Sequence, residues 1–168
     1  MYTADKTIDW YTQDCFVYRL VNQAFHTEDI ILWYLFRFLI IDLCTQLEKV
    51  HKEQNIQEYL KLYRGQARLP TQELENLRFN IGDCILTKAF LSTSKDIKVT
   101  QQFIIGAKDN DDFKVVIFEI IVNVFQLRSF IFVDIDQCQR KNGEQEILFN
   151  IESVFKIQNV EYDFELNV

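Results

Sequence analysis

The chain has 168 residues, of which 48% are hydrophobic and 26% charged, and it is long enough to bury a core without disulfides or metals. Its single proline and four glycines exclude collagen-like and Pro/Gly-rich disordered chains. Its formal net charge of −7, with no basic run longer than Arg140-Lys141, argues against nucleic acid and anionic membranes as partners.

The four cysteines, at positions 15, 44, 84 and 138, lack the close spacing of a zinc site, and neither histidine neighbours them. Their number alone allows two disulfides. The first ten residues, however, lack the charged-then-apolar pattern of a secretory signal. We therefore expect reduced thiols that fill the core of an intracellular, most simply cytoplasmic, protein with no metal site; a signal segment missing from this sequence would overturn that expectation.

Residues 1–57 are predicted to be helical. Asp9 or Thr12 is a candidate cap for a helix that runs to about Phe25. Thr27, which two acidic residues follow, is a second helix start, and apolar residues then recur at helical spacing up to residue 47.

The longest apolar stretch, residues 30–44, belongs to this second helix. Arg37 and Asp42 interrupt it, and it is shorter than the roughly 20 residues that span a bilayer. We therefore interpret it as a core helix and expect no contact with a membrane.

From residue 58 the alternation typical of strands replaces the helical pattern. Strands are predicted over residues 59–65, 85–91, 114–122, 129–133, 144–149 and 153–160. Helices are predicted over 71–77, capped by Thr71, and over 95–105, with a turn at 81–83 and polar loops at 109–112 and 134–143. Helices followed by strands indicate a single α+β domain over residues 1–168 rather than a doubly wound sheet.

Two motifs in this second part could bind an anionic ligand. Arg64 and Gly65 end the first strand, where an arginine fork can grip a phosphate and a glycine lets a ligand approach the backbone. Residues 92–94 (Ser-Thr-Ser) precede a helix, and their hydroxyls suit either ligand orientation or helix capping. Each motif alone is equally compatible with a structural role.

A third motif pairs two carboxylates. Glu144 and Glu146 are two residues apart in a predicted strand, so both should project from one face. Two carboxylates on one face repel unless a ligand or cation uses them. The alternative is a solvated edge strand.

Taken in order, Tyr-Arg-Gly, Phe-x-Ser-Thr-Ser and Glu-x-Glu on three separate strands resemble the Arg–Ser–Glu class of mono-ADP-ribosyltransferases. This class includes binary-toxin-type bacterial enzymes and arginine-specific vertebrate ecto-enzymes, and the resemblance covers residues 59–160. It implies a helical preface (1–57) and a β-rich catalytic core (58–168), in which two packed, mainly antiparallel sheets form a cleft for NAD.

The resemblance also assigns the NAD contacts. Arg64 would bind the NAD phosphates, and the backbone of Gly65 would recognise the nicotinamide carboxamide. Ser92 would orient the catalytic glutamate, while Thr93 and Ser94 would complete the motif and shape the nicotinamide pocket.

The two glutamates then take different roles. By resemblance, Glu146 would bind the 2′-hydroxyl of the nicotinamide ribose, and its charge suits the oxocarbenium character that develops as nicotinamide leaves. Glu144 would serve transfer to the acceptor. A second carboxylate can pair with a guanidinium and take its proton, so Glu at position 144 favours arginine as acceptor.

The two loops next to the site depart from the family pattern or leave choices open. Phe103 and Phe113 are candidates for stacking on nicotinamide, although Phe103 equally suits core packing. The loop 134–143, where the family presents an aromatic residue to its target, has none. Gln139 or Arg140 could substitute there, and Cys138 lies in the same loop.

Three functional hypotheses remain after this comparison. The leading one is an NAD-dependent protein-arginine ADP-ribosyltransferase that needs no metal. The second is an NAD glycohydrolase with water as acceptor, and the third is a catalytically silent module that binds NAD or protein. The sequence leaves the protein target and the oligomeric state open.

Overall fold

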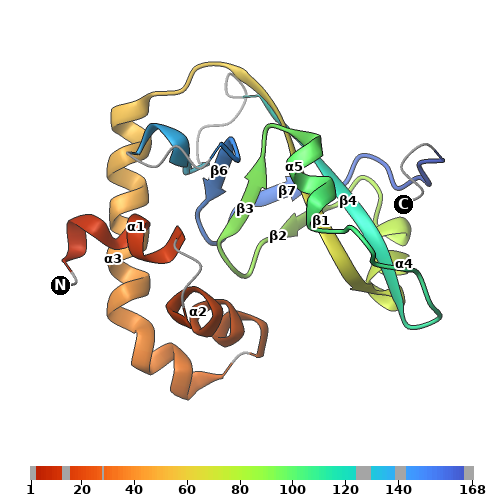
Figure 1. The fold of residues 1–168 in the computed structure, drawn as a ribbon, viewed down its shortest axis with the longest axis horizontal. Coiled ribbons are helices and arrows are strands. Elements are labelled where there is room, and N and C mark those ends of the chain that lie inside the picture. Colours follow the sequence, from red (N-terminus) through yellow and green to blue (C-terminus); the bar gives the residue numbers. More distant parts are fainter. Residues whose placement is uncertain (1–2, 13–15, 28, 124–129, 139–142, 165–168) are drawn as a thin grey trace.

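The computed structural model describes residues 3–12, 16–27, 29–123, 130–138 and 143–164. The helices of the first 54 residues gather on one side of the molecule, and the strands lie on the other side together with the two later helices (Figure 1). The helices are α1 (Thr7–Thr12), α2 (Phe16–Thr27), α3 (Ile30–Gln54), α4 (Thr71–Phe79) and α5 (Ile97–Gln102), with short 3-10 turns η1 (Ala4–Lys6) and η2 (Ile135–Gln137). The strands are β1 (Tyr59–Pro70), β2 (Cys84–Leu86), β3 (Leu91–Ser94), β4 (Phe113–Asn123), β5 (Phe132–Asp134), β6 (Glu146–Phe149) and β7 (Val154–Lys156).

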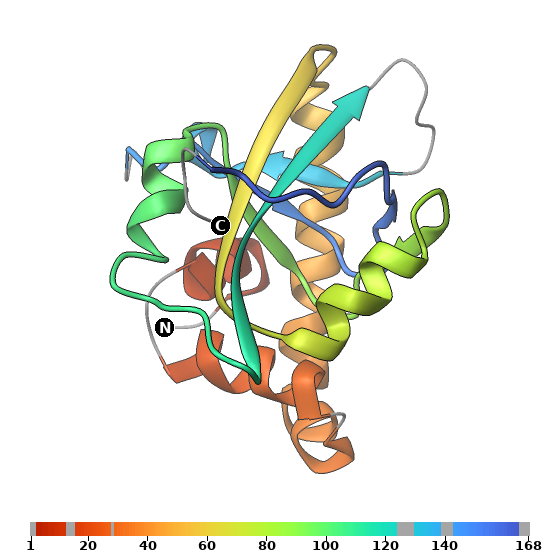
Figure 2. The same ribbon diagram turned by 90° about the vertical axis from the view of Figure 1, so that its right-hand side faces the viewer.

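The strands form two antiparallel sheets, as expected for the α+β class. Five strands follow the order β4-β1-β3-β6-β5, and β2 pairs with β7 in the second sheet. Figure 2 shows the long β1 and β4 side by side. Because β1, β3 and β6 are neighbours, the three motifs that lie far apart in the sequence come together at the centre of the five-stranded sheet.

Each face of the five-stranded sheet contributes to its own core. Side chains alternate along a strand, so Leu148 packs against α1–α3 whereas its neighbours Ile147 and Phe149 face the opposite way. The helix-side core also holds Tyr11, Phe25, Leu43, Leu47, Phe90 and Val133. Phe155 of β7 packs against the opposite core, which joins the second sheet to the first.

The last turns of α3 cover the edge strand β5. The Gln54 amide donates to the Asp134 carbonyl and accepts from its N–H, both at 2.8 Å. His51 Nδ1 lies 2.8 Å from the Phe132 carbonyl oxygen. Side-chain amide and imidazole thus replace a neighbouring strand, and the edge is protected from pairing with another chain.

Several helix predictions need correction. The helix predicted up to Phe25 is two helices, and α1 begins at Thr7, so neither Asp9 nor Thr12 caps it. The cap of α3 is Asp29 rather than Thr27: its carboxylate accepts from Ile31 N (2.8 Å) and Leu32 N (3.2 Å).

Two further corrections concern hydroxyls and strands. The Thr71 hydroxyl does not cap α4 but donates to the Asp111 carbonyl (2.8 Å). The strand predicted over 85–91 is two strands, β2 and β3, in different sheets. Thr87 and Lys88 lie at the break, but two polar residues are also compatible with one continuous strand, so they did not reveal it.

The prediction of a core helix over 30–44 is right only in part. Ile40 and Leu43 are buried, but the side chains of Ile31, Tyr34, Leu35, Phe38 and Ile41 are exposed along one side of the helix. Among the described helices, α3 is the one with the length and composition to cross a membrane, a test that core helices and signal sequences also pass.

Candidate active site

The centre of the candidate site is a hydroxyl–carboxylate pair between β3 and β6. Ser92 stands opposite Leu148 and Ser94 stands opposite Glu146, which makes Ser92 and Glu146 diagonal neighbours on one face. The Ser92 hydroxyl donates to Glu146 Oε1 at 2.5 Å. Both side chains are half-buried, so the hydrogen bond fixes the direction of the carboxylate at the start of its strand.

Arg64 joins this pair from β1. Its Nη1 donates to the Ser92 carbonyl oxygen at 2.8 Å rather than to a carboxylate. Among the described residues this is the one hydrogen bond of the guanidinium, so most of its five N–H donors remain available to an anionic ligand. The structure thus brings together the arginine, serine and glutamate that the sequence singled out.

Burial dominates the proton affinity of Glu146. Loss of hydration raises the pKa of this carboxyl above its ordinary value of 4.5, and the nearby negative charges of Glu144 and Asp136 raise it further. The Ser92 hydrogen bond and the positive charge of Arg64 act in the opposite direction. A carboxylate held half-buried without a direct cationic partner is suited to stabilising a positive charge that develops beside it.

The hydroxyls of the other two residues of the Ser-Thr-Ser motif bind backbone groups and do not face an open pocket. The buried Thr93 hydroxyl donates to the Ile147 carbonyl (2.9 Å), on the opposite face from Ser92. The buried Ser94 hydroxyl donates to the Glu144 carbonyl (2.6 Å) and accepts from Asp96 N (3.0 Å). Their proposed contribution to a nicotinamide pocket would therefore act through the backbone that they hold.

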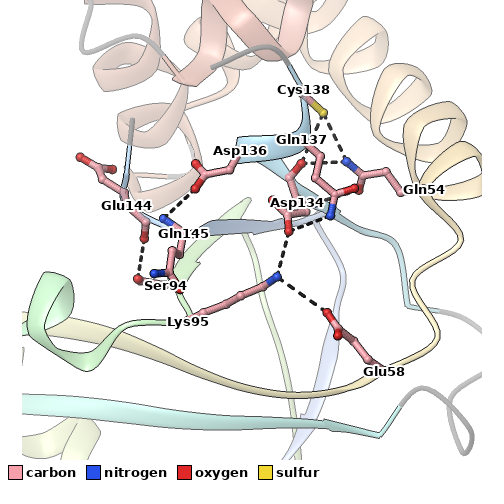
Figure 3. Close-up of polar contacts among 10 residues, drawn as sticks. All are labelled: Gln54, Glu58, Ser94, Lys95, Asp134, Asp136, Gln137, Cys138, Glu144 and Gln145. Atoms are coloured by element: carbon pink, nitrogen blue, oxygen red, sulfur yellow. Dashed lines mark hydrogen bonds and ion pairs between the residues drawn. The ribbon is translucent and has the colours of Figure 1, made fainter. Parts of the chain in front are cut away.

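Glu144 does not lie in a strand, which corrects the argument that placed both glutamates on one strand face. β6 begins at Glu146, and Gln145 has a left-handed backbone (φ 50°) that interrupts extended geometry. The Glu144 side chain is exposed and points away from Ser94, whose hydroxyl meets its carbonyl (Figure 3). Glu144 remains close enough to influence Glu146 electrostatically. The relative position of the two carboxylates, however, is determined by the turn at Gln145 and not by the alternation of side chains along a strand.

Close packing explains why residue 65 is a glycine, a constraint that the sequence did not reveal. A Cβ atom at this position would lie 2.8 Å from the Thr100 carbonyl oxygen and 3.0 Å from Ile104 Cγ2. Only glycine allows α5 to lie this close to β1. The predicted contact with nicotinamide remains untested beside this structural role.

The two candidate stacking aromatics lie in different places. Phe103 follows α5 and is exposed, near the contact of α5 with Gly65. Phe113 pairs with Pro70, six residues along β1 from Arg64 or roughly 20 Å. Its ring lies under the Arg68 guanidinium (4.3 Å), so the structure does not bring it to the Ser92–Glu146 pair.

The loop that should meet the acceptor is described only in part. Gln139 and Arg140 lie outside the described residues. Cys138 is half-buried, its Sγ lies 3.5 Å from both the Gln54 amide and the Asp134 carbonyl, and burial raises the pKa of its thiol to about 11. The thiol is therefore protonated at neutral pH and a poor target for oxidation.

Sequence reasoning missed a polar network beside the site. Lys95 Nζ binds Asp134 Oδ2 (2.9 Å) and approaches Glu58 (3.8 Å), while Gln137 also donates to Asp134 Oδ2 (3.1 Å) (Figure 3). A cavity of about 360 Å³ lies here, beside the Ser92–Glu146 pair rather than over it, lined by Lys95, Asp134, Asp136, Gln137, Gly143 and Gln145. In the described part of the chain, no three His, Cys, Asp or Glu side chains are placed to hold a metal ion.

Comparisons with known proteins bear on the fold. No protein-family model and no curated protein matches the sequence. Among solved structures, the chain is similar to the ADP-ribosyltransferase Vis in complex with agmatine, with a TM-score of 0.73 and 21% identity over 98% of this chain and 70% of that one. The chain has the ADP-ribosyltransferase fold.

Two further structures agree with this assignment. Vis in complex with the M6 inhibitor gives a TM-score of 0.71 at 21% identity, over 96% of this chain and 68% of that one. The Vis toxin from Vibrio splendidus gives 0.71 at 20% identity, over 98% and 70%. The expected fold is thereby confirmed: the first 54 residues are mainly helical, and the antiparallel sheets follow, with two shorter helices between their strands.

Proposed function

We propose that this ADP-ribosyltransferase-fold protein is an NAD-dependent mono-ADP-ribosyltransferase that transfers ADP-ribose to arginine side chains and releases nicotinamide. The observation that carries the proposal is the hydrogen bond from Ser92 to Glu146, with Arg64 fastened to the same serine. The fold gains little stability from such an arrangement, because Glu146 is half-buried and no cation of the described residues is bonded directly to it.

The residues fit NAD as substrate. The available N–H donors of Arg64 suit the pyrophosphate of NAD, because a planar guanidinium forms paired hydrogen bonds with phosphate oxygens. Glu146, fixed by Ser92, would accept a hydrogen bond from the ribose 2′-hydroxyl. As the bond to nicotinamide breaks, the ribose carbon gains positive charge, which the carboxylate stabilises, and nicotinamide leaves with the bonding electrons.

Arginine as acceptor rests on Glu144. This carboxylate is exposed and lies two residues from Glu146, so it can pair with an incoming guanidinium and take its proton as the nitrogen attacks the ribose carbon. The similar enzyme Vis has been solved with agmatine, a molecule that carries a guanidinium. Hydrolysis by water is the competing outcome, because the left-handed Gln145 places Glu144 outside the strand that holds Glu146.

The test measures nicotinamide release from NAD with and without agmatine. Wild type should release nicotinamide faster with agmatine and form ADP-ribosyl-agmatine. Glu146→Gln should lower both reactions roughly 100- to 1,000-fold. Glu144→Gln should lower transfer far more than hydrolysis, and Glu73→Gln, which makes the same change on the exposed surface of α4, should change neither.

The outcomes separate the three hypotheses. A rate of nicotinamide release that is the same with and without agmatine would indicate a glycohydrolase or another acceptor. Binding of NAD without release, by a folded sample, would contradict the enzymatic proposal and favour a silent binding module. Unchanged turnover in Glu146→Gln would contradict the assigned role of this carboxylate.

A further inference from the structure

Three hydrogen bonds hold the turn that separates the two glutamates. Ser94 Oγ donates to the Glu144 carbonyl (2.6 Å), and Lys95 N donates to the Gln145 carbonyl (3.1 Å). Gln145 N donates to the Asp136 carboxylate, at Oδ2 (3.1 Å). The first two bonds come from β3 and the residue after it, whereas the third comes from η2, beyond the end of β5 (Figure 3).

The bond from Asp136 is the one that constrains the unusual backbone. Gln145 has a φ of 50°, a conformation that costs a residue with a side chain roughly 1 kcal/mol or more and persists only where its surroundings enforce it. Asp136 accepts from the N–H of this same residue. Without that bond, the peptide between Glu144 and Gln145 would keep the Ser94 hydrogen bond on its carbonyl, but its N–H would lose the Asp136 acceptor, and the Glu144 side chain would be less well directed.

Asp136 is also a costly choice for a purely structural acceptor. Its Oδ1 atom is buried and has no hydrogen-bond partner among the described residues. An asparagine could accept the same hydrogen bond without burying part of a negative charge. Asp134 Oδ1 is also buried without a partner, but the ammonium of Lys95 compensates the charge of that carboxylate, whereas no cation of the described residues forms an ion pair with Asp136. Uncompensated cost of this kind concentrates at functional sites.

We infer that Asp136 is a positioning residue of the proposed transferase site: by holding Gln145 in its left-handed turn, it sets the direction in which Glu144 meets the acceptor guanidinium. The inference rests on the proposed function. Glu146 depends less on Asp136, because its pairing with Ser94 in the sheet and the Ser92 hydrogen bond hold it independently. Asp136 should therefore matter more for transfer than for hydrolysis.

Asp136→Ala and Asp136→Asn test this role together. Asp136→Ala should lower the ratio of agmatine transfer to hydrolysis roughly tenfold, because small displacements of a group that positions a substrate are costly. Asp136→Asn keeps an oxygen that can accept from Gln145 N, so its ratio should stay within about threefold of wild type. A role in folding alone would lower both reactions equally and would not be rescued by asparagine.

Two measurements add independent evidence. Amide hydrogen exchange at Gln145, followed by NMR, should be faster in Asp136→Ala than in wild type and unchanged in Asp136→Asn. Glu144, Asp136 and Arg64 are the charged groups that influence Glu146, and Asp136 raises its pKa. Asp136→Asn should therefore move the acid limb of the pH–rate profile to lower pH, whereas Asp111→Asn, the same change in the exposed loop before β4, should not.

The results distinguish this inference from the proposed function. A wild type that releases no nicotinamide contradicts the proposed function and the positioning role with it. An active wild type whose ratio is unchanged in Asp136→Ala contradicts the positioning role alone. Unchanged exchange at Gln145 in Asp136→Ala shows that Asp136 does not hold the turn, which overturns the inference whatever the activity.

Discussion

Two carboxylates at neighbouring strand ends are held in opposite ways. Asp134 ends β5 opposite Ile147, and Glu146, one residue before Ile147, begins β6. Asp134 is buried, and Lys95 and Gln137 both donate to its Oδ2. Among the described residues, Glu146 receives one hydrogen bond, from a hydroxyl, while Arg64 donates to a backbone carbonyl.

The difference separates a structural acid from a functional one. Asp134 ties β5 to Lys95, and Gln54 of α3 binds its backbone in both directions, so the residue holds three parts of the fold together. Glu146 is left short of compensating charge, with a raised pKa. A half-buried acid that the fold does not neutralise is the better candidate for chemistry.

Asp134→Ala should break the structural side of this comparison with the largest effect. It leaves the ammonium of Lys95, about three-quarters buried, with only Glu58 at 3.8 Å. The free energy of unfolding should fall by about 3 kcal/mol, because an unpaired buried charge is costly. Urea unfolding measures the loss, and NAD turnover per folded molecule should stay within about threefold of wild type.

A double-mutant cycle with Lys95→Ala provides the control. If the ion pair stabilises the fold, the sum of the losses in unfolding free energy for the two single variants should exceed the loss for the double variant by about 1 kcal/mol or more. Additive losses would show that the two side chains do not stabilise each other, and that the Asp134 carboxylate acts instead through the hydrogen bond from Gln137.

The sequence predicted the parts of the fold whose pattern is local. Regular alternation located β1, and a run of β-branched and other apolar residues located β4. Helical spacing located α3, and a helix start at Thr71 located α4, although the ends of these elements differ from the predicted ones by a few residues. The break between β2 and β3 was missed, because Thr87 and Lys88, the polar residues of the link, are also compatible with one continuous strand.

The site divides in the same way. Arg64, Ser92 and Glu146 were recognisable as motifs on strands, and the structure brings them together. The left-handed Gln145 and its bond to Asp136 were not, because glutamine gives no signal for positive φ and the contact spans a loop. The packing role of Gly65 likewise depends on where α5 lies.

Ser92→Ala should sharpen the functional side of the comparison. Glu146 would lose its one hydrogen bond, so its carboxylate would be less well oriented, and nicotinamide release should fall roughly tenfold or more. The Ser92 bond lowers the pKa of Glu146, so its removal should raise that pKa and move the acid limb of the pH–rate profile to higher pH. Steady-state rates between pH 4 and 8 measure both effects.

Thr93→Val is the matched control for the loss of a hydroxyl. Thr93 is adjacent, but its hydroxyl binds the Ile147 carbonyl on the opposite face of the sheet. The variant should lose about 1 kcal/mol of stability without moving the acid limb. An acid limb that moves equally in both variants would contradict a specific role for Ser92.

The smallest expected effect is a gain of stability in Glu146→Gln. The folded protein binds a proton at Glu146 more tightly than the unfolded chain does, because burial raises the pKa of this group above 4.5. The free energy of unfolding therefore falls as the pH rises through that raised pKa. Glutamine does not ionise, so the variant should be more stable than wild type at pH 7, and the difference should shrink toward pH 4.

Asp134→Asn should instead be less stable than wild type at pH 7, since it removes the anion that Lys95 binds. Urea unfolding at both pH values measures these changes in stability. A gain for Glu146→Gln and a loss for Asp134→Asn would confirm that Asp134 stabilises the fold whereas Glu146 is held at the expense of stability. A loss of stability in both variants would contradict it.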